Sequence, residues 1–393
     1  MGLNDTVSAE RFKISFFGRC NAGKSSLINA ITGQELSVVS EVAGTTTDPV
    51  KKAMELLPVG PVMIVDTAGL DDIGELSDKR IQKTEEVLRS TDMAVLVIDG
   101  REGILAHDKE QISLYLKKKI PYIVVYTKSD LLDKIPKAEE NSIYVSSLTR
   151  SGIYELKELI GKKAKNYSHE KPIVSDLLKK GDTAVLVVPI DKAAPKGRLI
   201  LPQQMVIRDL LDGGMQALVC RDSELRETLD KLRDLPDIVI TDSQVFGKIK
   251  DLVPEEVPLT SFSILMARYK GTLGQALEGA AMLDKIKDGD SILISEGCTH
   301  HRQCGDIGTV KLPNLIRKKT GCDPEFSFTS GGTFPGDLSE YNLIIHCGGC
   351  MLNEKEMAYR ADAALSQGIP FTNYGIVLAK LNGILNRSIK NVI

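Results

Sequence analysis

Two groups of residues in this chain have the types and the spacing that chemistry requires. The first is the octapeptide Gly18–Ser25, GRCNAGKS, which matches the pattern G-x-x-x-x-G-K-[ST] of phosphate-binding loops. The second is a concentration of thiols and imidazoles, because five of the seven cysteines and three of the five histidines lie between residues 298 and 350. The octapeptide predicts a nucleotide site, and the cysteine-rich segment predicts a metal site.

The octapeptide follows an apolar run, Lys13–Phe17, that is typical of a strand, and it opens a segment with a helical pattern. Glycine lets backbone N–H groups curl around phosphate oxygens, and the positive end of the helix dipole adds to the attraction. We expect Lys24 to reach the β- and γ-phosphates and Ser25 to ligate Mg²⁺. The residues expected to contact the phosphates are Gly18, Asn21, Ala22, Gly23, Lys24, Ser25 and Ser26.

Two further motifs would complete a magnesium site. In the motif DTAG, which follows a predicted strand, Asp66 is expected to hold Mg²⁺ through water while the Gly69 amide senses the γ-phosphate. The motif GTTTD, residues 44–48, lies in a polar loop and can supply a hydroxyl to the metal. The acidic segment Asp71–Asp78 could hold a catalytic acid, and the sequence does not single one out.

The next motifs are suited to a purine base. In TKSD, which begins at Thr127, the stem of Lys128 can lie on a flat base and Asp130 can accept from two adjacent N–H donors, as on the edge of guanine. In SSL, Ser146 and Ser147 end another strand, where a backbone amide could bind the base oxygen. All five motifs occur in the order of a guanine-nucleotide site, which chance does not explain.

The cysteines and histidines form a spaced pattern, C-x-H…H-C-x-x-C, and each half follows a predicted strand. Because the carboxyl ends of parallel strands meet at one edge of a sheet, we expect the two halves to lie close together. Three thiolates with at most one weaker ligand suit either Zn²⁺ or an iron–sulfur cluster, and the spacing leaves both open. The residues of the pattern are Cys298, His300, His346, Cys347 and Cys350. Ordinary core or surface roles are expected for Cys20, Cys220, His301, Cys304 and Cys322.

Three αβ blocks would position these residues. Strand-like runs alternate with helical patterns in each block, which predicts an α/β fold with a doubly wound parallel sheet in the first. The runs are Lys13–Phe17, Met63–Val65, Ala94–Ile98, Tyr122–Tyr126, Ala184–Pro189, Ala217–Cys220, Asp237–Thr241, Ser291–Ser295, Glu325–Thr329, Leu343–His346 and Pro370–Asn373. We predict a P-loop domain over residues 1–168, a smaller αβ domain for dimerisation over 172–265, and a metal-binding αβ domain over 266–393.

Composition excludes several classes of protein. The net charge of −3 and an aromatic fraction of 5% argue against nucleic acid as a partner. The sequence has no apolar run of the length of a membrane span, and its start lacks the apolar stretch of a signal peptide. An odd number of cysteines argues against a disulfide framework. We therefore expect a cytoplasmic protein.

The first block resembles the translation-factor-related GTPases, particularly the branch that includes the tRNA-modification GTPase TrmE, through GRCNAGKS, GTTTD, DTAGL, TKSD and SSL. The resemblance implies that Asn21 helps to bind K⁺ in place of an arginine finger and that Thr46 binds Mg²⁺. It also implies slow, potassium-stimulated hydrolysis of GTP to GDP, with Leu70 where Ras-like proteins have a water-positioning glutamine. One departure is Thr127, which replaces the usual asparagine of N-K-x-D and leaves the nucleotide affinity open.

Over essentially its whole length, the chain resembles the FeFe-hydrogenase maturation GTPases, the HydF family. The resemblance implies a scaffold that holds a 4Fe-4S cluster on Cys298, Cys347 and Cys350 and carries a diiron precursor as cargo. It also implies radical-SAM maturases and apo FeFe-hydrogenase as partners, and a homodimer or a larger oligomer. The fourth cluster position is left open between His300, His346, Asp191 and an exogenous ligand.

The sequence thus predicts a GTPase that assembles or delivers the diiron subcluster of FeFe-hydrogenase. The catalytic residues expected are Lys24, Asn21, Thr46 and Gly69. The alternative is an RNA-modification or ribosome-assembly GTPase with a structural zinc domain.

Overall fold

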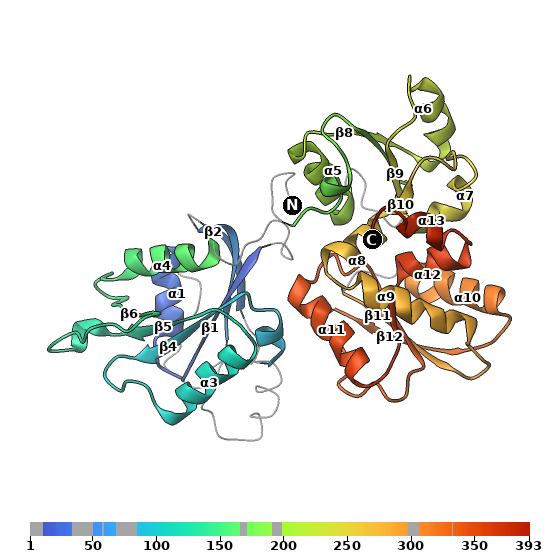
Figure 1. Cartoon of the computed structure of the whole chain (residues 1–393). Helices are drawn as coiled ribbons and strands as arrows, with labels where there is room; N and C mark the ends of the chain where they lie inside the picture. Colours follow the sequence, from blue (N-terminus) through green and yellow to red (C-terminus); the bar gives the residue numbers. More distant parts are fainter. Residues whose placement is uncertain are drawn as a thin grey trace. The chain divides into compact units, whose positions relative to one another are not determined.

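The computed structural model of the chain describes residues 11–33, 50–56, 59–67, 85–165, 171–190, 199–297, 306–331 and 333–393. The chain divides into two compact units, Met1–Glu170 and Lys171–Ile393. Each unit is built of helices around β-sheet (Figure 1), so the predicted α/β class is confirmed. The boundary predicted between residues 265 and 266 falls inside the second unit.

The first unit contains a six-stranded sheet with the order β2-β3-β1-β4-β5-β6. All neighbouring strands are parallel except β2 and β3, which run antiparallel; only three residues separate these two strands in the sequence, too few for a parallel crossover. Strand β2 was not among the predicted strands. The strands are β1 (Phe12–Gly18), β2 (Val50–Leu56), β3 (Gly60–Asp66), β4 (Met93–Asp99), β5 (Tyr122–Thr127) and β6 (Ser142–Tyr144). The α-helices described in this unit with defined bounds are α1 (Lys24–Thr32), α3 (Ala106–Lys117) and α4 (Ile153–Lys165).

Strand β4 shows why this sheet is covered on both faces. All seven of its residues are buried. Alternate side chains enter two different cores, with Met93, Val95 and Val97 on one face and Ala94, Leu96 and Ile98 on the other. A strand buried on both faces reads as a continuous apolar run, which is what the sequence shows here.

The second unit holds two four-stranded sheets, and both are wholly parallel. The first has the order β10-β9-β7-β8, and the second has the order β12-β11-β13-β14. The strands are β7 (Thr183–Val187), β8 (Gln216–Cys220), β9 (Ile238–Thr241), β10 (Leu259–Ser261), β11 (Ser291–Glu296), β12 (Glu325–Ser330), β13 (Leu343–His346) and β14 (Phe371–Asn373). The α-helices are α5 (Leu201–Asp212), α6 (Leu225–Lys231), α7 (Phe246–Ile249), α8 (Phe262–Tyr269), α9 (Leu273–Ala280), α10 (Leu312–Thr320), α11 (Glu354–Ser366), α12 (Tyr374–Leu381) and α13 (Leu385–Ile389).

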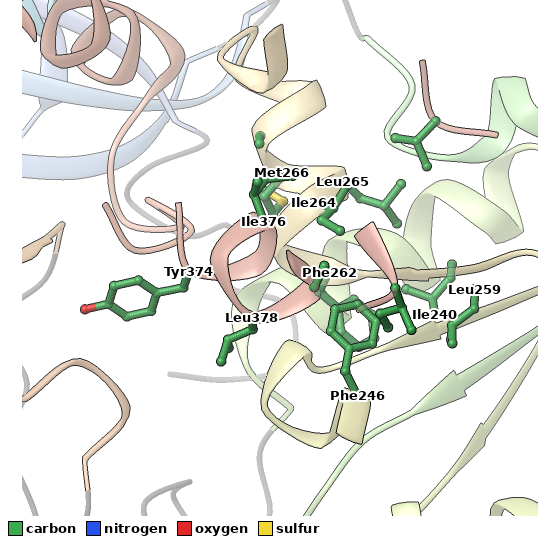
Figure 2. Packing of buried hydrophobic residues seen from close by; sticks show 14 of the residues in the cluster. Ile240, Phe246, Leu259, Phe262, Ile264, Leu265, Met266, Tyr374, Ile376 and Leu378 are labelled. Carbon is green, nitrogen blue, oxygen red and sulfur yellow. The ribbon is translucent and has the colours of Figure 1, made fainter. Parts of the chain in front are cut away.

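One hydrophobic core joins the two sheets of the second unit. Its members include Ile240 of β9, Ile294 of β11 and most of helix α8. Figure 2 shows α8 side chains, among them Phe262 and Met266, in the same cluster as Phe246 and residues of α12. Helix α8 therefore belongs to the core of both sheets.

None of the helices in the described part of the chain has both the length and the apolar character that crossing a bilayer requires.

Candidate functional site

The phosphate-binding loop connects β1 to α1, and two of its glycines are fixed by conformation. Gly18 has φ 149°, and a Cβ atom there would lie 2.2 Å from the carbonyl oxygen of Val97. Gly23 has φ 89° at the start of α1. Residues with a Cβ atom rarely adopt such φ angles, so the loop needs glycine at both positions.

The cation and the hydroxyl of the loop lie where phosphate chemistry would need them. Lys24 is buried, and its Nζ donates to the carbonyl oxygens of Gly18 and Arg19, each at 2.8 Å. Ser25 Oγ donates to Asp66 Oδ2 at 3.0 Å. The structure therefore brings together the predicted phosphate ligand and both predicted magnesium residues that it describes.

Thr127, the departure from the usual asparagine, is tied to the phosphate-binding loop. Its hydroxyl donates to the carbonyl oxygen of Ala22 at 2.6 Å and lies 3.1 Å from that of Ile98. A Cβ atom on Gly23 would lie 3.4 Å from this hydroxyl, so threonine fills the space beside the loop. The threonine thus connects the base-binding motif to the loop through one short side chain.

The residues predicted to bind the base are also held in place by hydrogen bonds. Lys128 Nζ donates to the carbonyl oxygen of Asn21 at 2.9 Å. Ser146 is fully buried, and its hydroxyl donates to Asp130 Oδ1 at 2.5 Å while it accepts from the backbone N–H of Thr149. Asp130 itself is exposed and can accept from a ligand.

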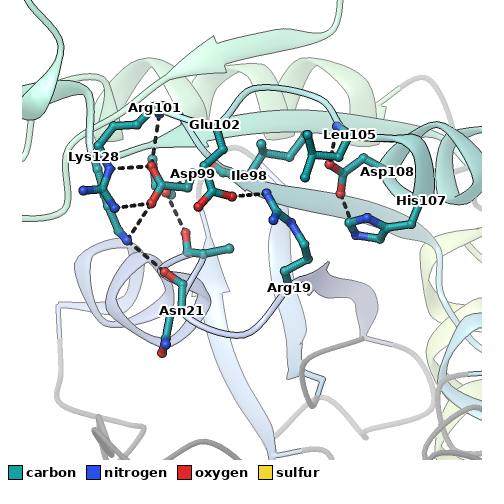
Figure 3. A network of polar contacts seen from close by, with 12 residues as sticks. Arg19, Asn21, Ile98, Asp99, Arg101, Glu102, Leu105, His107, Asp108 and Lys128 are labelled. Atoms are coloured by element: carbon teal, nitrogen blue, oxygen red, sulfur yellow. Dashed lines mark hydrogen bonds and ion pairs between the residues drawn. The ribbon is translucent and has the colours of Figure 1, made fainter. Parts of the chain in front are cut away.

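Asp99 is a residue of this site that the sequence analysis did not find. Its carboxylate accepts from Lys128 Nζ at 2.8 Å and from Arg101 Nε at 3.0 Å, as Figure 3 shows. Hydrogen bonds from Arg101 and Lys128 hold the pKa of this carboxyl well below its usual range, against the effect of burial. A carboxylate at the end of the apolar run of β4 was the signal that could have indicated it.

Several predicted residues lie outside the described part of the chain. These are Thr46, Gly69, the segment Asp71–Asp78, Asp191, Cys298, His300, His301 and Cys304.

The two halves of the cysteine pattern follow neighbouring strands. Strands β11 and β13 pair in parallel with Ser295 opposite His346. Cys347 Sγ accepts from the backbone N–H of Gly297 at 3.1 Å and from that of Gly349 at 3.3 Å. Gly297, which directly precedes Cys298 in the sequence, therefore lies at the same edge of the sheet as Cys347.

The two cysteines at this edge, Cys347 and Cys350, are half-buried. Burial raises the pKa of Cys347 to about 11, although the two backbone N–H groups oppose the shift. Burial also raises the pKa of Cys350, while the charge of the buried Lys270 lowers it. A sulfur atom that accepts backbone N–H groups in a half-buried loop, as Cys347 Sγ does, suits a thiolate ligand of a metal centre. Within the described residues no group of three or more metal-ligating side chains occurs.

His346 is placed differently from the two cysteines. It is fully buried, with Nδ1 at 2.8 Å from the carbonyl oxygen of Cys347 and Nε2 at 3.1 Å from a guanidinium nitrogen of Arg360. Both ring nitrogens are therefore engaged within the protein.

Buried polar residues surround this edge, and the sequence analysis did not find them. Tyr374 donates to Glu296 Oε1 at 3.1 Å, and Lys270 Nζ donates to the carbonyl oxygen of Leu352 at 2.7 Å. By contrast, Cys322 lies elsewhere, with Sγ 3.2 Å from the carbonyl oxygen of Ile286.

The fold and these sites define a P-loop GTPase domain joined to two parallel sheets with their helices, and one of these sheets ends in a half-buried C-x-x-C loop. Residues 13–128 match the model of the 50S ribosome-binding GTPases. Residues 173–271 match the hydrogen maturase F dimerization domain, and residues 274–391 match the hydrogen maturase F tetramerization domain. These two models together match more than half of the chain, and the chain belongs to the hydrogen maturase F family.

Curated relatives match the first unit. The tRNA modification GTPase MnmE of Nitrosomonas europaea is 32% identical over 160 residues, which cover 39% of this chain and 35% of that protein. The GTPase Der of Sulfurimonas denitrificans is 39% identical over 133 residues, which cover 33% of this chain and 27% of that protein. The chain thus spans about a third of the length of the curated relatives that it matches.

Two solved structures are also similar. The structure of Aquifex aeolicus Era bound to GDP and AlF4⁻ has 18% identity and a TM-score of 0.35, and the match covers 53% of this chain and 93% of Era. The structure of NFeoB from S. thermophilus bound to GDP, AlF4⁻ and K⁺ has 20% identity and a TM-score of 0.32, and the match covers 39% of this chain and 61% of that chain.

Proposed function

We propose that this chain is a GTP-hydrolysing scaffold that carries a 4Fe-4S cluster and assembles or delivers the diiron subcluster to apo FeFe-hydrogenase. The observation that carries the proposal is that one chain joins a P-loop nucleotide site to the half-buried cysteines Cys347 and Cys350, at a sheet edge where the backbone N–H of Gly297 contacts Cys347 Sγ. Membership of the hydrogen maturase F family supports the role in hydrogenase maturation.

Residues of the first unit would perform the hydrolysis. A phosphate would draw Lys24 Nζ away from the two loop carbonyls that it now contacts, because an ammonium group bonds more strongly to anionic oxygen. Ser25 and Asp66 would hold Mg²⁺, the aspartate through water. Mg²⁺ held there would supply charge neutralisation at the β- and γ-phosphates. Thr46 would bind Mg²⁺, and the backbone amide of Gly69 would sense the γ-phosphate.

Asn21 is the residue that we propose for potassium. Its backbone has φ 59°, and Lys128 Nζ holds its carbonyl oxygen. Potassium would stand where other GTPases receive an arginine finger, so hydrolysis would be slow and stimulated by K⁺. Replacement of potassium by sodium should then slow hydrolysis, and equal rates in the two salts would remove this part of the proposal.

The cluster would be held by Cys298, Cys347 and Cys350, with one iron open to exchange. His346 has both ring nitrogens engaged in this structure, which favours His300, Asp191 or an exogenous ligand at the fourth position. An iron with an exchangeable ligand is a chemically suitable handle for the diiron cargo.

The remaining parts of the proposal concern partners. Self-association is supported by the matches to dimerization and tetramerization domains. Radical-SAM maturases would supply the diiron precursor, and apo FeFe-hydrogenase would receive it, in the cytoplasm. GTP hydrolysis would reorder residues 36–50 and 66–80, and different contacts of these segments in the two nucleotide states would change how the partners dock.

Metal analysis tests the proposal most directly. The protein is purified without oxygen, its iron, sulfide and zinc are measured, and an EPR spectrum is recorded after reduction. We expect iron and sulfide in equal amounts, with an EPR signal that Cys347→Ser removes and Cys322→Ser retains. A colourless protein with one tightly bound zinc ion and no EPR signal would contradict the cluster and support the structural zinc domain of the alternative function.

The independence of the two sites can be tested separately. Lys24→Ala should abolish GTP hydrolysis and leave the iron content unchanged, because the two sites lie in different units of the chain. Loss of both properties in this variant would contradict the division of labour.

A further inference from the structure

Arg360 is a fully buried arginine next to the cysteine loop. Its Nε donates to Glu356 Oε1 at 2.9 Å, and one terminal nitrogen donates to the carbonyl oxygen of Gly331 at 2.9 Å. The other terminal nitrogen lies 3.1 Å from His346 Nε2. Burial of a guanidinium is costly unless acceptors surround it, so this arrangement is specific. Its acceptors come from α11, from β13, from the segment that follows β12 and, through the Ser295 hydroxyl at 3.5 Å, from β11.

The contact with Arg360 determines the tautomer of His346. A guanidinium group only donates hydrogen bonds, so His346 Nε2 must accept. The ring hydrogen is then on Nδ1, which donates to the carbonyl oxygen of Cys347 at 2.8 Å. A neutral imidazole in this state has no lone pair left for a metal.

Both the backbone and the thiol of Cys347 are therefore held by hydrogen bonds. His346 binds its carbonyl oxygen, and the N–H groups of Gly297 and Gly349 point at its sulfur. Gly349 has φ 62°, and a Cβ atom there would lie 2.4 Å from Met357 Sδ, so the loop packs against α11.

We infer that Arg360 and His346 are positioning residues that hold the C-x-x-C loop in the orientation of a ligand, and that His346 does not bind iron. The inference rests on the proposed cluster function. Side chains that hold metal ligands contribute about 10- to 100-fold to metal affinity in other proteins. Loss of the Arg360 contact should therefore weaken retention of the cluster without changing its ligands.

The first test replaces His346. Asparagine can keep a donor near the position of Nδ1, whereas phenylalanine removes both ring nitrogens. We expect His346→Asn to retain the wild-type EPR spectrum and any histidine ¹⁵N coupling seen in protein labelled with ¹⁵N-histidine. His346→Phe should lose iron to a chelator about 10-fold faster, with an unchanged spectrum. A histidine coupling that disappears in His346→Asn would show that His346 is a ligand and would overturn the inference.

The second test replaces Arg360 together with its ionic partner, since a lone buried carboxylate would destabilise the fold. In the double variant Glu356→Gln/Arg360→Met, iron loss should again be about 10-fold faster. In metal-free protein, Cys347 should react faster with an alkylating reagent, because the loop loosens. Wild-type rates of both processes in the folded double variant would contradict the role of Arg360. If the double variant does not fold, the two His346 variants decide.

Measurements on the wild-type protein in the same series distinguish failure of the proposed cluster function from failure of the positioning role of Arg360 and His346. Absence of an iron–sulfur cluster there would contradict the proposed function, whereas the alkylation rates of the metal-free proteins would still test the positioning of Cys347.

Discussion

Replacement of Asp99 by asparagine tests how the base-binding lysine is held. The Asp99 carboxylate accepts from Lys128 Nζ at 2.8 Å, from the Arg101 backbone N–H at 3.0 Å and from the Arg101 guanidinium at 2.7 and 3.0 Å. Asparagine keeps the size of the side chain, removes its charge and leaves one acceptor oxygen. Lys128 then loses its ionic partner, while its bond to the carbonyl oxygen of Asn21 remains.

The size of the effect follows from the exposure of the pair. The Lys128 side chain is 30% exposed and that of Asp99 is 6% exposed, so water screens part of the attraction. Exposed ion pairs contribute about 0–1 kcal/mol, and hydrogen bonds to charged groups contribute about 1.5–3 kcal/mol. We take about 1 kcal/mol for the contact with Lys128, which corresponds to an affinity for GDP and GTP about fivefold lower.

Titration with a fluorescent GDP analogue measures this change. The matched control is Arg101→Ala, which leaves the carboxylate and Lys128 together and should keep the affinity within about twofold of wild type. Folded Asp99→Asn protein that binds GDP as tightly as wild type would refute the idea that Asp99 positions Lys128.

The same variant has an expected pH dependence. Arg101 and Lys128 lower the pKa of Asp99 from its ordinary value of 3.8. A carboxyl group whose pKa is lowered in the folded state contributes stability above its unfolded pKa and loses it as the pH falls towards the folded value. Thermal unfolding should thus show a smaller loss of stability below about pH 4 in Asp99→Asn than in wild type.

Substitutions at three further positions test single contacts. Gly18→Ala would place a Cβ atom 2.2 Å from the carbonyl oxygen of Val97 in β4. This variant should lower the free energy of unfolding by at least about 3 kcal/mol and abolish GDP binding, and melting close to that of wild type would contradict this. Thr127→Val removes the hydroxyl that lies 2.6 Å from the phosphate-binding loop and should cost about 1–3 kcal/mol, whereas Thr127→Ser should retain most of the stability; equal melting of the two variants would count against the bond. Gly349→Ala, at φ 62°, should cost about 1–2 kcal/mol and lower the iron content; wild-type melting and iron content in this variant would contradict the need for glycine there.

Local patterns predicted much of the fold. The strand Leu343–His346 has the bounds that its apolar run indicated, and the six-residue strand β11 exceeds its prediction by one residue. These strands are buried on both faces, so their composition alone reveals them. The phosphate-binding loop was equally visible, because its glycines and lysine are required by the chemistry at fixed spacing.

What the sequence could not predict depends on contacts between distant segments. Helix α8 is apolar on almost all of its faces, so its sequence lacks the alternation of polar and apolar residues with a period of about 3.6 that identifies a surface helix. Asp99 gains its role from Lys128, which lies 29 residues away in the chain. His346 fits a metal-ligand pattern by spacing, yet the structure shows both of its nitrogens bound to Cys347 and to Arg360.

The core that joins the two sheets of the second unit implies that two segments matched by separate family models fold as a single unit. Segments 173–271 and 274–391 match separate family models, yet α8 of the first and α12 of the second pack into one core. Arg387 of the second segment also donates to the carbonyl oxygens of Val253, Pro254 and Val257 in the first. A cut between the segments would expose apolar side chains on both pieces. The two segments should therefore melt in one cooperative transition, and neither should survive alone as a well-folded fragment. Partners that associate through one segment would thereby act on the stability of the other.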